Sequence, residues 1–145
     1  MAHALYDKGR EAFLKGQINW IYDVIKVALV QTPSSSNNSG YKVDLTSHKF
    51  LSSVPADSII DTKILERGSS DADNGVANGS NVTFENVPLG KVVGAIIIYK
   101  QSQTADAGAS QLIAYLDQLN GLPYQANGSN IQINWDNGIN KIFKL

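Results

Sequence analysis

The sequence predicts an all-β fold, a β-sandwich or jelly-roll-like barrel with one short N-terminal helix. Three observations support this prediction. About eight short segments carry alternating apolar and β-branched residues, the pattern of half-buried strands. Stretches rich in Gly, Asn and Ser separate them, as turns do. The period of the apolar residues changes from helical to alternating after Gly16.

The first 20 residues are predicted to form a helical arm, and residues 21–145 the β-sandwich domain. Tyr6, Phe13 and Leu14 fall on one side of a helix running from Ala4 to Lys15. Gly16 stands where helices commonly end. An amphipathic helix outside a β-core needs another surface for its apolar side, so we expect this arm to attach the protein to a neighbour.

Apolar runs predict the strands that follow. They cover residues 23–31, 41–45, 58–66, 82–87, 91–100, 111–118 and 130–136. The run from Val92 to Ile98 is apolar at both alternating positions, which is typical of a central strand buried on both faces. One helical turn, closed by Pro55, is expected just before that residue. Polar segments at residues 32–40, 67–81 and 102–110 are expected to form exposed loops.

The C-terminal segment predicts a hairpin. Asn137-Gly138 favours a two-residue turn between a strand that ends near Trp135 and a last strand over residues 141–145. No register of that hairpin places Ile142, Phe143 and Leu145 on one face. We therefore expect the last strand to be covered by its own hairpin on one side and by another copy or a capsid on the other.

Composition narrows the function classes. The chain has 145 residues, and its 12 Lys and Arg are scattered singly within a net charge of -1, so we expect no nucleic-acid partner. It contains no cysteine, which excludes thiolate nucleophiles and cysteine-ligated zinc. The longest apolar run is too short to span a bilayer, so no membrane partner is expected. Charged residues near the N-terminus argue against a signal peptide.

Catalytic and metal-binding motifs are missing from the sequence. The two histidines, His3 and His48, lie outside any recognisable nucleophile motif, so we expect no enzymatic activity. Residues 71–75 read DADNG, but the glycine comes one place early for a calcium loop and position twelve is Val82. We therefore expect neither a metal nor another cofactor.

Aromatic residues are the remaining candidates for ligand binding, as a platform for a saccharide. They are Trp20, Tyr22, Tyr41, Tyr115, Tyr124 and Trp135. Most lie on strand faces among aliphatic residues, which favours core packing. Tyr124, in a Gly- and Pro-containing turn, is explained least by packing.

Segments spread over nearly the whole chain resemble a family of small virion structural proteins of tailed bacteriophages. They read LYDKGREAFLKGQINW, IKVALV, HKFLSSVP, AIIIYK, LIAYLD and INWDNGINKIFKL. Residues 34–39 and 71–81 depart from the resemblance, as local insertions at loop tips do. The resemblance implies a non-enzymatic protein, assembled in the host cytoplasm, that decorates or cements the outer surface of a capsid.

The partners implied by this resemblance are the major capsid protein and other copies of the chain, with a homotrimer as the favoured arrangement. The residues expected to make capsid or subunit contacts are Tyr6, Phe13, Leu14, Trp20, Ile142, Phe143 and Leu145. The alternative is a tail or baseplate component, including a module that binds a receptor or saccharide.

Overall fold

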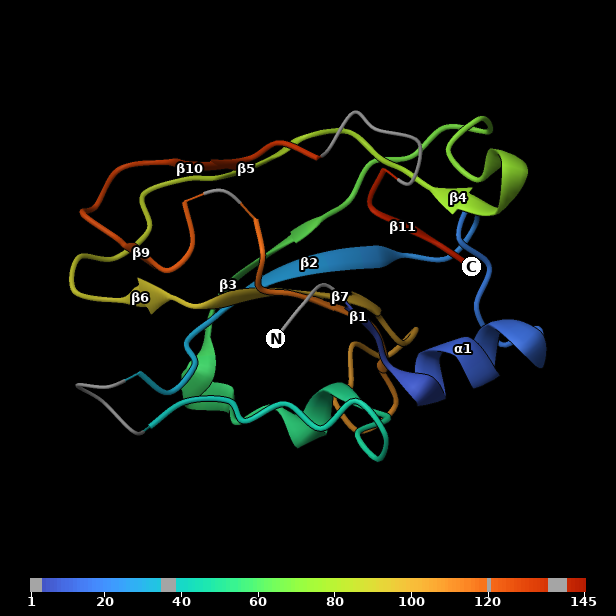
Figure 1. Ribbon diagram of the computed structural model, residues 1–145, viewed down its shortest axis with the longest axis horizontal. Helices are drawn as coiled ribbons and strands as arrows, with labels where there is room; N and C mark the ends of the chain where they lie inside the picture. The colour runs from blue at the N-terminus through green and yellow to red at the C-terminus, as the bar shows by residue number, and fades with distance from the viewer. Residues whose placement is uncertain (1–3, 35–38, 120, 136–140) are drawn as a thin grey trace.

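The main sheet is antiparallel and has five strands, in the order β1-β8-β7-β2-β3 (Figure 1). The computed structural model describes residues 4–34, 39–119, 121–135 and 141–145. Its elements are β1 (Ala4–Leu5), α1 (Asp7–Leu14), β2 (Ile25–Val30), η1 (Leu51–Ser53), η2 (Ala56–Ser58), β3 (Ile59–Ile64), η3 (Asp73–Gly75), β4 (Val76–Ala77), β5 (Val82–Phe84), β6 (Val92–Val93), β7 (Ala95–Lys100), β8 (Gln111–Leu116), β9 (Tyr124–Gln125), β10 (Ile131–Ile133) and β11 (Phe143–Lys144).

The all-β prediction is confirmed, with α1 as the single α-helix among the described residues. The layer above the main sheet in Figure 1 contains the two-stranded ladders β10-β5 and β11-β4, and a third ladder joins β6 to β9. No continuous second sheet, as a complete sandwich or jelly roll has, is formed by the described part of the chain.

Strand β7 is central, as its uninterrupted apolar sequence predicts. It pairs with β2 on one side and β8 on the other, and Ala95 to Tyr99 are all buried. The predicted strand is interrupted at Gly94, where no side chain fits, because a Cβ there would lie 1.9 Å from Oγ1 of Thr32. Residues before Gly94 leave the main sheet and pair with β9 as β6. The predicted single strand is thus divided between two ladders, β6 with β9 and β7 in the main sheet.

The two faces of the main sheet carry separate apolar clusters. One face contributes Val27, Leu29 and Ile96 to a cluster with α1 and the small ladders. The other contributes Ala28 and Ile97 to a second cluster, which the segment of residues 41–58 covers. Figure 1 shows this segment below the sheet. Cover on both faces explains why the strands are so apolar.

The covering segment differs in part from its prediction. Residues 41–45 form no strand, so that prediction is wrong. Tyr41 nevertheless is buried against the sheet, with Val43 and Leu45 partly buried beside it. The predicted helical turn is present as η1, just before Val54 and Pro55. The apolar residues of this segment therefore lie in the core, as their pattern predicts, but the backbone that carries them is not a strand.

The N-terminal helix is shorter than predicted and is part of the domain core. It begins at Asp7, because Ala4 and Leu5 pair with β8 as β1. It ends before Gly16, whose φ of 71° is readily adopted by glycine. Farther along, Ile18 and Trp20 are buried in the first cluster. The described part of the predicted arm, residues 4–20, is therefore continuous with the core of residues 21–145.

The predicted C-terminal hairpin is wrong. Strand β10 pairs with β5, and β11 pairs with β4, so the two predicted hairpin strands have different partners. The Asn137-Gly138 turn lies outside the described residues. The polar segment of residues 67–81, expected to be a loop throughout, supplies β4 and buries Ala77. The last strand finds its backbone partner in a segment whose composition gave no strand signal.

Candidate interaction surface

Three aromatic rings from distant parts of the chain meet at the C-terminal strand. Phe143 lies edge-on to Trp20, with ring centroids 5.2 Å apart and ring planes at 83°. Its centroid lies 6.3 Å from that of Phe13, on the last turn of α1. Such tilted arrangements suit the charge distribution of aromatic rings. We call these residues, Phe13, Trp20 and Phe143, the aromatic cluster.

Arg67 holds the segment that carries Trp20. Its guanidinium donates hydrogen bonds to the backbone carbonyls of Trp20, Leu65 and Asp23, and lies 5.7 Å from the Trp20 ring. The indole N–H of Trp20 donates to the carbonyl of Asn78 at 3.0 Å. Burial lowers the pKa of Arg67. No local sequence pattern marks Arg67, because a lone arginine after a strand belongs to no motif.

Two leucines next to the aromatic cluster are exposed. Leu14, which follows Phe13 at the end of α1, is 89% exposed, and Leu145, at the C-terminus, is 59% exposed. Leu145 lines a small apolar pocket, and its amide donates to the carbonyl of Gly75 at 2.9 Å. The pocket has a volume of about 70 Å³ and is lined by Phe13, Trp20, Ala72, Gly75, Val76, Ala77, Phe143 and Leu145. Leu145 is therefore an apolar side chain that the described part of the fold leaves accessible.

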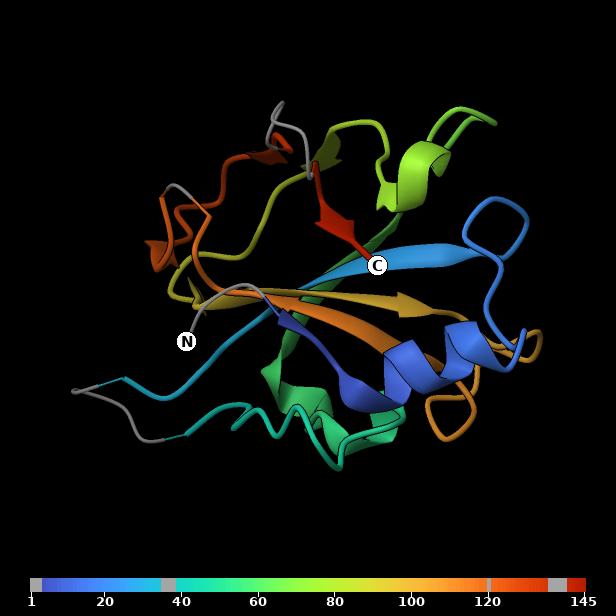
Figure 2. The ribbon, with the colours of Figure 1, turned by 45° about the vertical axis from the view of Figure 1, so that its right-hand side comes forward.

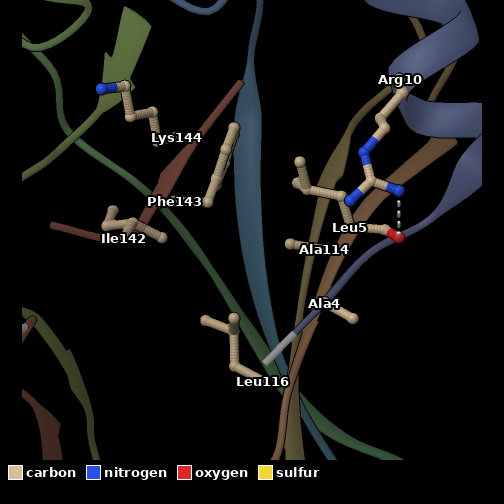
Figure 3. Close-up of a pocket in the computed structure, with 8 residues that line it drawn as sticks. All are labelled: Ala4, Leu5, Arg10, Ala114, Leu116, Ile142, Phe143 and Lys144. Carbon is tan, nitrogen blue, oxygen red and sulfur yellow. Dashed lines mark hydrogen bonds between the residues drawn. The ribbon is translucent and has the colours of Figure 1, made fainter. Parts of the chain in front are cut away.

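A larger groove lies on the other side of β11. Its volume is about 330 Å³, and it is lined by Ala4, Leu5, Arg10, Ala114, Leu116, Ile142, Phe143 and Lys144. Figure 3 shows the guanidinium of Arg10 turned back toward Leu5, whose carbonyl it meets at 3.4 Å. Arg10 also pairs with Asp7 at 3.2 Å. Lys144 points away from the middle of the groove (Figure 3). The groove walls are thus mainly apolar, and its arginine is already paired.

The predicted contact residues separate into buried and exposed groups. Tyr6, Trp20, Ile142 and Phe143 are buried within the chain itself, and Phe13 is partly buried against the first cluster. Leu14 and Leu145 are exposed. The structure therefore brings Phe13, Trp20, Phe143 and Leu145 together around one pocket, and places Tyr6 apart from them in the second cluster. The covering of Ile142 and Phe143 comes from their own chain, not from the predicted hairpin and a neighbour.

Tyr6 begins a hydrogen-bonded chain of polar groups beneath the main sheet. Its hydroxyl lies 2.8 Å from the hydroxyl of Tyr41, which lies 2.7 Å from Nδ1 of His48. Burial raises the pKa of Tyr6 above its ordinary range and the pKa of Tyr41 to about 12. The His48 ring also stacks on the Tyr41 ring, with centroids 5.5 Å apart. These contacts give His48 a packing role in the covering segment.

Asp71, from the calcium-loop-like stretch, binds backbone and amide groups. One carboxylate oxygen accepts the amide of Gly68 at 2.7 Å, and the other accepts the side chain of Asn78 at 3.3 Å. Within the described parts of the chain, no group of three or more His, Asp or Glu side chains is placed to hold a metal ion. The carboxylate of Asp71 closes the loop that leads into β4.

The aromatic candidates for a saccharide platform do not gather on one face. Trp20, Tyr41 and Tyr115 are buried, which confirms core packing for these three. Trp135 is partly buried and its indole N–H donates to the carbonyl of Ser80 at 2.9 Å. Tyr22 is 86% exposed. Tyr22 is the most exposed side chain of this group, whereas Tyr124, in β9, is partly buried and lines a groove of about 210 Å³.

Comparisons with known proteins give no relative for this chain. No family model, no curated protein and no solved structure matches it. The described helix is also too short to cross a membrane.

Proposed function

We propose that this protein is a non-enzymatic structural protein of a tailed-phage virion. In this role it decorates or cements the outer capsid surface through contacts to the major capsid protein and to other copies of itself. The observation that carries the proposal is the exposure of Leu14 and Leu145 beside the aromatic cluster. Exposed apolar patches mark interaction sites on proteins.

The composition supports a contact-making protein. Charged residues make up 17% of the chain, compared with about 25% in an average globular protein. Fewer charges mean a smaller desolvation cost when this surface meets another. The anchors lie at the ends of α1 and the chain, and the aromatic cluster fixes both backbones. A preorganised surface loses less conformational entropy on binding.

Attachment to particles tests this proposal. Purified protein is added to particles that lack it, and the bound amount is measured after sedimentation. We expect Leu14→Asp with Leu145→Asp to reduce attachment at least tenfold while the variant remains folded. Leu89→Asp is the matched control, because Leu89 is 77% exposed in the turn between β5 and β6. Equal attachment by the wild-type protein and the double variant would contradict a role for these leucines.

Copy number in purified particles tests the location. A capsid-decorating protein is expected on the order of hundreds of copies per particle, because capsids repeat their sites by symmetry. A handful of copies would favour the alternative, a tail or baseplate component. Quantitative gel staining against the major capsid protein gives this ratio directly.

The alternative is favoured by one observation, the exposed ring of Tyr22. Exposed tyrosines can stack on sugars, because the ring is apolar while the hydroxyl is polar. A receptor-binding role predicts saccharide binding that Tyr22→Ala abolishes and Tyr22→Phe largely keeps. Isothermal titration with host surface saccharide measures it. A lack of binding would leave the capsid role as the better proposal.

A further inference from the structure

The groove that Tyr124 lines lies at the end of the molecule away from α1. Its lining residues belong to the segment that leads into β9, to β9 itself and to β10 with the residue before it. Figure 1 shows β9 and β10 on the left and α1 on the right, and in Figure 2 the orange β9 and the blue α1 again lie on opposite sides. The groove is therefore separate from the exposed Leu14 at the end of α1.

The lining of this groove combines one aromatic ring with neutral polar groups. Tyr124, Asn130 and Gln132 supply a hydroxyl and two amides, and the other lining residues are aliphatic or glycine. Among the described residues that line the groove, none carries a charge. A charged ligand would lose part of its hydration here without gaining an opposite charge, which is costly. The composition of the lining therefore favours a neutral ligand.

The backbone that carries Tyr124 is held by the ladder between β9 and β6. Tyr124 lies opposite Val93 in this ladder, and the amide of Ala126 donates to the carbonyl of Lys91 at 2.7 Å. The Tyr124 side chain is partly buried. Within the part of the chain that the structure describes, its hydroxyl makes no hydrogen bond. Tyr124 thus supplies an apolar ring on a fixed backbone and a hydroxyl that is available to a ligand.

Two amide side chains add hydrogen-bonding groups to the groove. Oδ1 of Asn130 accepts the backbone amide of Asn86 at 2.9 Å, which orients this side chain while its NH₂ group can still donate. Gln132 is the middle residue of β10, opposite Thr83, and is exposed. Its side-chain amide makes no hydrogen bond to any described residue, so it can both donate and accept. Donors and acceptors are therefore present beside the aromatic ring.

We propose that this groove binds a neutral saccharide. A sugar ring has apolar C–H faces, which can pack on the Tyr124 ring, and hydroxyl groups, which can donate to and accept from the Tyr124 hydroxyl and the Gln132 amide. The volume of about 210 Å³ is below the roughly 300–1,000 Å³ of pockets for drug-sized ligands, so it suits one sugar unit. This site differs from the exposed ring of Tyr22, which precedes β2, and it does not depend on the virion role.

Amide chemical shifts of the ¹⁵N-labelled full-length protein test the proposal. Methyl α-glucoside, methyl β-galactoside, N-acetylglucosamine and maltose are titrated separately. We expect at least one of them to shift signals of residues 121–133 to saturation, with a dissociation constant on the order of 1 mM, as the few contacts of one sugar unit allow. Tyr124→Ala should weaken this binding about tenfold or more, and Tyr124→Phe, which keeps the ring, should weaken it less. Gln132→Ala should also weaken it, whereas Gln125→Ala, an exposed residue of β9 outside the lining, should not.

Three results would overturn this assignment. They are a lack of saturable shifts with all four saccharides, shifts confined to signals outside residues 121–133, and binding that Tyr22→Ala removes but Tyr124→Ala and Gln132→Ala keep. Binding of an uncharged peptide, acetyl-tetraalanine amide, in place of the saccharides would assign the groove to a protein partner instead. Thermal unfolding of each variant establishes that lost binding does not come from lost folding. Particle attachment is measured separately, so failure of either proposal leaves the other unaffected.

Discussion

The ring of Phe143 packs edge-on against Trp20 at a centroid distance of 5.2 Å, which joins the C-terminal strand to the segment after the N-terminal helix. Phe13 closes the same cluster from α1. The backbone of β11 adds a ladder with β4, in which Phe143 lies opposite Ala77. The last strand is therefore fixed by contacts with two distant parts of its own chain, and Leu145 is left at the surface.

Phe143→Ala is expected to lower the free energy of unfolding by about 3–5 kcal/mol, the usual cost of removing a buried Phe. The reason is the loss of ring contacts with both Trp20 and Phe13. Urea denaturation measures the change. Leu145→Ala is the control two residues away, and its exposed side chain should contribute less than about 1 kcal/mol. Similar losses for both variants would contradict the role of the cluster in stability.

Arg67→Lys is expected to destabilise the protein by about 2 kcal/mol or more, although the charge is kept. One ammonium cannot reproduce the planar set of donors that reaches the carbonyls of Trp20, Leu65 and Asp23. Chemical denaturation gives the change in stability, and tryptophan fluorescence in a Trp135→Phe background reports the environment of Trp20. Arg10→Lys, on the exposed side of α1, serves as the control and should change stability little. If Arg67→Lys leaves the stability unchanged, a positive charge alone is sufficient at this position and the planar set of donors is not required.

Gly9→Ala is expected to destabilise the fold by about 1–3 kcal/mol, although alanine favours helices. A Cβ at this position would lie 2.8 Å from the carbonyl oxygen of Leu112 and 3.1 Å from Cα of Ile113, so α1 would have to move away from β8. Thermal unfolding measures the effect. Leu14→Ala, on the exposed end of the same helix, should be nearly neutral. If Gly9→Ala raises the melting temperature, α1 does not pack this closely on the sheet.

Alkaline pH is expected to unfold the protein through its buried tyrosines. Burial raises the pKa of Tyr41 and of Tyr115 from 10.0 to about 12, so the folded state keeps protons that the unfolded state has lost. This contribution to stability is complete below pH 10 and is lost as the pH rises toward 12. Urea denaturation at several pH values in this window measures the decline. Tyr115→Phe removes one titrating group and should make the decline shallower, and an unchanged slope would contradict this assignment.

The sequence by itself determined the longer strands of the main sheet. Alternating or continuously apolar runs located β2, β3, β7 and β8, and the two-sided apolar pattern identified β7 as central. Gly16 correctly marked the end of α1. These features could be predicted because the spacing of apolar residues along the chain indicates both the type of element and the face that it buries. The exposure of Leu14 and Leu145, in contrast, could not be read from that order.

Only the tertiary structure decided how the short segments pair. The Asn137-Gly138 signal favoured pairing β10 with β11, yet β10 pairs with β5 and β11 pairs with β4. A two-residue strand such as β4 is too short to show an alternating pattern in its own sequence. Its partner is set by which distant segment packs beside it. The role of Arg67 also could not be predicted from local sequence. Two of the carbonyls that it binds belong to residues more than 40 positions away, and the third belongs to nearby Leu65. Local sequence thus specifies the apolar content of each segment, whereas long-range packing selects its partner.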